Sequence, residues 1–164
     1  MKKLFLVRHG KSSWKHPDLS DYERPLNKRG NRDVPFMAKL LKEQNVSPDL
    51  IVSSPALRAI TTAEIMALEF GYPVSDIVKE EMIYEADTNE LLQIINNFPE
   101  DKNIVIMFGH NPGLTLLSNF ISDKRIDNIP TCGIVNIDLY IDKWKDVDFD
   151  NGKVVSFDYP KKYL

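Results

Sequence analysis

Three short apolar runs, each followed at once by a polar, turn-forming motif, constrain the fold of this chain more than any other feature. The runs end at Val7, Val52 and Phe108, and the motifs that follow them are Arg8-His9-Gly10, Ser53-Ser54-Pro55 and Gly109-His110-Asn111. Short apolar runs bounded by turn signals are typical of strands buried on both faces. Stretches of helical periodicity separate the runs, so the pattern predicts an α/β fold, with a parallel or mixed sheet covered by helices.

Periodicity and end signals locate the remaining elements. We expect a helix over residues 29–45, in which Pro35 either introduces a kink or marks the true first turn behind an Asp33 cap. A second helix is expected to open with Ser54 as N-cap and Pro55 at its first position, and to stop at Gly71. The other expected elements are a short strand at 76–79, helices at 88–98 and 114–121, and two late strands at 131–141 and 154–157 that form a hairpin.

Composition and charge favour one globular domain over residues 1–164. The chain is 43% hydrophobic and 27% charged, which is typical of globular proteins. Its net charge of −3 provides no general attraction for nucleic acid or for an anionic membrane, so any phosphate affinity must be local. The apolar run after Met1 is too short for a signal peptide, and the single Cys132 cannot form an intramolecular disulfide. We therefore expect a cytoplasmic protein.

Two arginines and two histidines are expected to meet at one edge of the sheet. The carboxyl ends of parallel strands share an edge, and ligands of open α/β sheets bind there. Arg58, early in the second helix, can reach back over that edge toward Arg8, His9 and His110. Helix N-termini after the second and third of these strands add unpaired N–H groups and partial positive charge. The pattern predicts a pocket for a phosphoryl group.

These motifs resemble those of the histidine phosphatase superfamily, the phosphoglycerate-mutase-like group. The likeness covers residues 4 to 115 and includes Arg24-Pro25-Leu26-Asn27 in the first loop and Thr62-Ala63 after Arg58. In size the chain is most similar to the small SixA-like phosphohistidine phosphatases. The resemblance implies a three-layer α/β/α sandwich with a mostly parallel central sheet, and chemistry that needs no metal or other cofactor.

The resemblance also implies a role for each central side chain. His9 is the residue phosphorylated, Arg8 and Arg58 hold the phosphoryl group, and His110 completes the pocket. A nucleophilic histidine must be neutral, and two nearby guanidinium groups are expected to oppose the protonation of His9. The expected reaction is capture of the phosphoryl group on His9, followed by attack of water.

Further residues complete the predicted site. Glu85 is the nearest positional match to the carboxylate that many superfamily members use as an acid, although the residues around it depart from the mutase pattern. Ser12 and Lys15 are expected at the pocket mouth, where Lys15 adds a phosphate contact, or else in a solvated loop. Asn111 is expected to bind phosphate at a helix start. Arg24 is expected at the surface, or in steering anionic substrate.

Other interpretations of the same residues are less consistent with the sequence. A zinc site formed by His9, His16 and His110 would place two arginines beside a dication, so no metal is expected. A cysteine phosphatase needs an arginine six positions after Cys132, where the chain has Asp138, so Cys132 is expected in the core. A module that only binds phosphate needs no nucleophile, and mutases of the family carry extra chain over the site.

The sequence therefore predicts a phosphatase whose substrate is phosphohistidine on a protein or a small phosphate ester, such as a sugar or nucleotide phosphate. The segment between the second helix and the strand at Asn103 is too short to supply a lid, which favours the protein substrate. No nucleic acid or membrane partner is expected, and the sequence does not indicate an oligomeric state.

Overall fold

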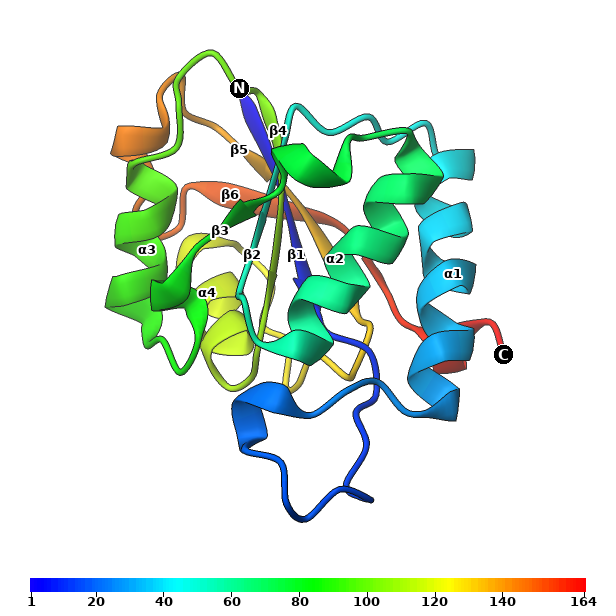
Figure 1. Cartoon of the computed structure of the whole chain (residues 1–164). Helices are drawn as coiled ribbons and strands as arrows, with labels where there is room; N and C mark the ends of the chain where they lie inside the picture. The colour runs from blue at the N-terminus through cyan, green and yellow to red at the C-terminus, as the bar shows by residue number, and fades with distance from the viewer.

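The computed structural model describes residues 1–164, which form a six-stranded mixed sheet with four helices (Figure 1). The strands are β1 (Lys2–Arg8), β2 (Leu50–Ser53), β3 (Val78–Lys79), β4 (Ile104–Gly109), β5 (Ile134–Leu139) and β6 (Gly152–Asp158). The helices are α1 (Lys28–Glu43), α2 (Leu57–Phe70), α3 (Thr88–Asn96) and α4 (Gly113–Ile121). The strand order is β3-β2-β4-β1-β5-β6, parallel from β3 to β1 and antiparallel for the last two strands.

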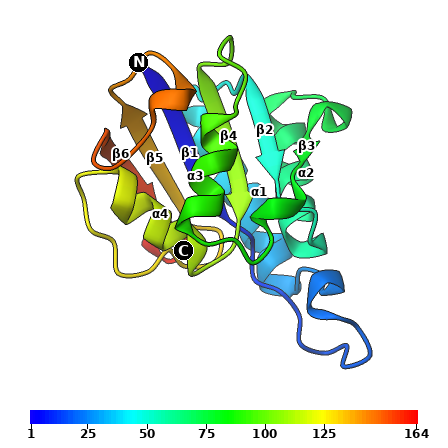
Figure 2. The ribbon, with the colours of Figure 1, turned by 90° about the vertical axis from the view of Figure 1, so that its left-hand side faces the viewer.

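Helices cover both faces of the sheet, which confirms the predicted three-layer sandwich. Figure 2 shows α3 and α4 in front of the sheet, with α1 and α2 behind it. The strand β1 contributes to both cores: Leu4 and Leu6 pack in the cluster with α3 and α4, and Phe5 and Val7 pack in the cluster with α1 and α2. Alternate side chains of a strand point to opposite faces. A strand buried on both faces must therefore be apolar throughout, as the sequence is.

The predicted helix over residues 29–45 is confirmed to within two residues at each end, but the alternative Asp33 cap and the predicted Ser54-Pro55 start of the second helix are wrong. The helix α1 begins at Lys28, where the Asn27 side chain accepts a hydrogen bond from the Gly30 N–H, and it continues through Pro35. Asp33 is not a cap, because its buried carboxylate pairs with two arginines of the same helix. The helix α2 begins at Leu57 rather than Pro55, because the Ser54 hydroxyl accepts from the Ala56 N–H and holds a non-helical turn.

Other predicted features are confirmed. Gly71 ends α2 in the left-handed conformation with φ at 71°, which a residue without Cβ adopts at little cost. The two late strands form an antiparallel hairpin, and Cys132 is fully buried in the core under α1 and α2. No helix combines the length and the apolar character that a membrane crossing requires.

Candidate active site

The carboxyl ends of β1, β2 and β4 meet at one edge of the sheet, as the sequence predicts. The strand β4 lies between the other two, and all three are parallel. Beyond the strands, the His9 N–H donates to the Gly109 carbonyl at 3.2 Å, and the Ser54 N–H donates to the Phe108 carbonyl at 3.0 Å. The three motifs are therefore joined side by side by their backbones.

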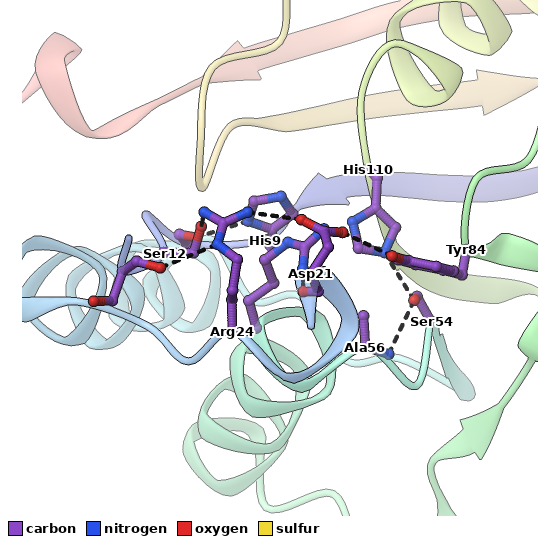
Figure 3. Close-up of polar contacts among 11 residues, drawn as sticks. His9, Ser12, Asp21, Arg24, Ser54, Ala56, Tyr84 and His110 are labelled. Carbon is purple, nitrogen blue, oxygen red and sulfur yellow. Dashed lines mark hydrogen bonds and ion pairs between the residues drawn. The ribbon is translucent and has the colours of Figure 1, made fainter. Parts of the chain in front are cut away.

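His9 and His110 face one another across this edge. Their ring centroids are 5.2 Å apart and the rings are tilted by 51° (Figure 3). His9 is only 7% exposed, and its Nδ1 lies 2.7 Å from the Gly10 carbonyl oxygen. A carbonyl can only accept, so Nδ1 carries the proton and Nε2 carries the lone pair. This tautomer leaves Nε2 free to act as a nucleophile.

Burial is the main reason that both imidazoles are neutral. Desolvation lowers the pKa of His9 to about 3, against the Gly10 hydrogen bond that raises it, and His110, Arg58 and Arg8 lower it further. The pKa of His110 falls to about 4 through burial and the charges of Arg58 and Arg8, with Asp21 acting in the opposite direction. The sequence argument assigned this effect to the arginines alone and missed the larger contribution of burial.

These two pKa values predict that acid destabilises the fold. An unfolded histidine binds its proton near pH ~6.5, whereas folded His9 and His110 do so only near 3 and 4. Between pH ~6.5 and these lower values the unfolded chain binds more protons than the folded chain does. The histidines' contribution to the free energy of unfolding is therefore full above pH ~6.5 and declines as the pH falls. Urea unfolding of wild type and His9→Asn between pH 7.5 and 4.5 should show a shallower decline in the variant. Equal pH slopes would contradict burial of a neutral His9.

Two guanidinium groups lie beside the histidine pair. Arg58, the second residue of α2, is buried, and Arg8 follows the apolar part of β1. The Arg8 Nη1 donates to the Ile129 carbonyl at 3.0 Å, while its Nε is buried without a partner. Burial and the nearby charge of Arg58 lower the pKa of Arg8. The two guanidinium groups are close enough for the charge of Arg58 to act on Arg8, and such a pair of cations favours an anion between them.

An aspartate that the sequence analysis did not single out, Asp21, completes the polar network. One carboxylate oxygen accepts from Arg58 at 3.0 Å. The same oxygen accepts from the Tyr84 hydroxyl at 2.7 Å, and the other accepts from Arg24 at 2.8 Å (Figure 3). Burial acts to raise the pKa of Asp21, but the hydrogen bonds from Tyr84, Arg24 and Arg58 outweigh it and the pKa lies below its usual range. The carboxylate is therefore ionised at neutral pH.

Ser54 and Tyr84 position His110. The Ser54 hydroxyl lies 2.8 Å from the His110 Nε2, and the Tyr84 ring meets the imidazole edge-on at 5.5 Å. Burial and the hydrogen bond to Asp21 raise the pKa of Tyr84 to about 12, so the phenol keeps its proton. The imidazole is thus held between a hydroxyl and an aromatic ring.

Of the predicted pocket-mouth residues, only Ser12 belongs to this network. Its buried hydroxyl accepts from the Arg24 Nη2 at 2.5 Å, so Ser12 supports Arg24 instead of presenting its oxygen to solvent. Lys15 lies in the exposed part of the same loop, and its ammonium group forms no hydrogen bond or ion pair. Arg24 itself is 8% exposed, so it is a buried organising residue and not a surface charge.

The Asn111 amide is used within the fold. Its nitrogen donates to Asn128 and to the Ile129 carbonyl, and its oxygen accepts from Thr115. The Ile129 carbonyl also accepts from Arg8, so Asn111 contributes to the site by holding the loop that fixes Arg8.

Glu85 shares a cavity with His110 without joining the hydrogen bonds of either histidine. It is exposed, adopts a left-handed φ of 59°, and lines a cavity of about 390 Å³ together with His110. A ligand on His110 therefore has a carboxylate within the same cavity.

The β1 motif is fixed by its neighbours. The Cys132 N–H donates to the carbonyls of Arg8 and His9, and the Gly10 N–H donates to the Thr62 hydroxyl. A Cβ on Gly10 would lie 2.7 Å from a methyl group of Val34, so this glycine permits close packing against α1. His16 is exposed in the loop, and the chain contains no group of three or more histidine, cysteine or acidic side chains placed to share a metal ion.

Comparison with known proteins places this geometry in a family. Residues 4–93 match the histidine phosphatase superfamily (branch 1). The fold superimposes on SixA from Agrobacterium tumefaciens with 27% identity and a TM-score of 0.80, covering 97% of this chain and 98% of that one. The protein histidine phosphatase SixA complexed with tungstate gives 22% identity and a TM-score of 0.84, with 99% of both chains covered.

An uncharacterised chloroplastic protein of Arabidopsis thaliana is 29% identical over 153 residues, which span 88% of this chain and 70% of that protein. The family match covers more than half of the sequence, and the motifs that it contains lie at one edge of the sheet. The chain therefore belongs to the histidine phosphatase superfamily and is SixA-like.

Proposed function

We propose that this protein is a phosphatase that removes the phosphoryl group from phosphohistidine on a protein, through a covalent intermediate on His9. The observation that supports this most directly is the neutral, buried His9, with Nδ1 bonded to Gly10 and its ring 5.2 Å from that of His110. A nucleophile held in one tautomer, with cations beside it, is the arrangement that phosphoryl capture needs.

In the first step the Nε2 lone pair of His9 attacks phosphorus. The bond from phosphorus to the substrate's imidazole nitrogen breaks, and that imidazole leaves after taking a proton from solvent water. In the second step water attacks phosphorus, the bond to Nε2 breaks, and inorganic phosphate leaves. Arg58 uses two of its five N–H donors on Asp21, so the others are free for phosphoryl oxygens.

The surroundings of the site favour a protein substrate over a small ester. Leu57, at the start of α2, and Leu116, which lines the cavity with His110, are 42% and 53% exposed. Trp14, in the loop that carries Ser12, is 75% exposed. Large apolar side chains exposed around a polar site are typical of a surface that another protein covers.

The proposal is tested by comparing substrates under one condition. A phosphohistidine peptide, p-nitrophenyl phosphate and a set of sugar and nucleotide phosphates should be assayed side by side with excess EDTA present. We expect the highest kcat/KM for the phosphohistidine peptide. A sugar or nucleotide phosphate hydrolysed faster than the peptide would instead support the small-ester alternative.

Glu85 is the proposed acid for ester substrates, and Glu85→Gln tests it. An alkoxide leaving group needs a proton far more than an imidazole or a p-nitrophenolate does, so we expect a loss on the order of 10²-fold for alkyl esters such as sugar phosphates and a much smaller loss for phosphohistidine and p-nitrophenyl phosphate. Steady-state kcat with each substrate checks this, with Glu43→Gln at the far end of α1 as control. Equal losses for an alkyl ester and for phosphohistidine would show that Glu85 is not the acid.

A further inference from the structure

A cationic groove adjoins the phosphate site on the side of the first loop. It has a volume of about 770 Å³, and no acidic side chain lines it. Its lining combines the loop with the first turns of α1, and its charged and titratable members are Lys15, His16, Lys28, Arg29 and Arg32. None of these side chains is needed for the contacts among the two histidines, Arg8 and Arg58 described above.

The local charge of this groove opposes that of the whole chain. Arg29 and Arg32 both pair with the single buried carboxylate of Asp33, while Lys15 and Lys28 form no ion pair. Four cations against one carboxylate leave a local excess of three positive charges, in a chain with a net charge of −3. No acidic residue occupies the first turn of α1, where the helix dipole favours negative charge. This excess of positive charge favours the binding of an anionic group in the groove.

One arginine connects the groove to the site. Arg24 donates through Nε to the carbonyl of Ser13, which lines the groove, and through Nη1 to Asp21, which holds Arg58. The face of the Arg24 guanidinium stacks on the Trp14 ring, 3.3 Å from its centroid. Because every nitrogen of Arg24 is also hydrogen-bonded, Trp14 rests on a fixed support, next in the chain to Ser13 and Lys15 of the groove.

We propose that this groove docks an acidic segment of the phosphorylated protein, with Trp14 as the apolar anchor beside it. The inference deepens the proposed function and rests on it. Lys15, Lys28 and Arg32 are exposed and Arg29 is half-buried. Together they spread over the loop and over positions 28–32 of α1, four helical steps or about 6 Å. Cations drawn from two separate segments match an extended acidic surface better than a single phosphate. Aromatic side chains with fixed support are common anchors in protein interfaces.

Two phosphohistidine peptides, identical except that glutamates or lysines flank the phosphohistidine, test this proposal. Wild type is expected to show a higher kcat/KM for the acidic peptide at 50 mM salt, through a lower KM, and to lose much of that preference at 300 mM. Lys28→Glu should lower kcat/KM for the acidic peptide about three- to tenfold and raise it for the basic peptide. Phosphoramidate is too small to reach the groove, so Lys28→Glu should hydrolyse it at the wild-type rate.

Lys39→Glu is the matched control, because Lys39 is exposed on the same helix and lies outside the groove. It changes the net charge equally and should leave the preference intact. Equal effects of the two variants, or no preference in wild type, would overturn the docking proposal while leaving the phosphatase proposal standing. If wild type hydrolyses neither peptide, the proposed function itself fails.

Discussion

Replacing His9 with alanine is expected to lower kcat by at least about 10³-fold with every substrate, because the variant has no atom to receive the phosphoryl group. The loss should not depend on the leaving group, since the missing step precedes product release. Folding should be retained, because the His9 side chain makes a single hydrogen bond, to its neighbour Gly10. Steady-state kinetics with the phosphohistidine peptide, alongside circular dichroism, measures both effects.

Lys39→Ala supplies the comparison, since Lys39 is exposed on α1 and lies outside both the site and the groove. It should turn over like wild type. Retained turnover in His9→Ala would show that another group receives the phosphoryl, and the account of the site would then be wrong.

Arg58→Ala is expected to cost about 10²- to 10³-fold in kcat/KM, because it removes one of the two cations that we propose to bind the phosphoryl oxygens. Arg58→Lys should recover only part of this loss, since an ammonium group keeps the charge but loses the planar fork. Tungstate is an oxyanion of phosphate-like shape, and its inhibition should be weakest for Arg58→Ala, intermediate for Arg58→Lys and strongest for wild type. Titrating the three proteins with tungstate separates lost anion binding from lost chemistry.

Arg125→Ala is the control for these variants, because Arg125 is exposed and forms no ion pair with the rest of the chain. If Arg58→Ala binds tungstate as well as wild type does, Arg58 does not hold the anion. In that case its bonds to Asp21 serve only to fix the first loop.

Much of the fold follows from short-range patterns. The apolar runs at β1, β2 and β4 must be buried on both faces, and together with the helical stretches between them this favours parallel strands covered by helices. The gathering of Arg8, His9 and His110 then follows from the shared edge of parallel strands. These statements need only the sequence along each strand and the geometry of sheets.

The errors and omissions arise where distant contacts decide the outcome. Asp21 bonds to Arg58, 37 positions away, and to Tyr84, 63 positions away, so no local pattern marks it. Ser54 satisfies the helix-start pattern, but its hydroxyl serves the Ala56 N–H and His110 instead of capping α2. A capping residue and a site residue share the same chemistry, and only the tertiary structure distinguishes them.

Rapid-quench trapping of the phosphoenzyme tests the central claim most directly. Wild type mixed with a ³²P-labelled phosphohistidine peptide and quenched within milliseconds should carry one label per chain, stable to alkali and labile to acid, which maps to Nε2 of His9. Fresh unlabelled substrate should chase the label into inorganic phosphate at a rate no slower than kcat. Normal turnover with no label on His9, or with the label on another residue, would contradict the proposed covalent intermediate on His9.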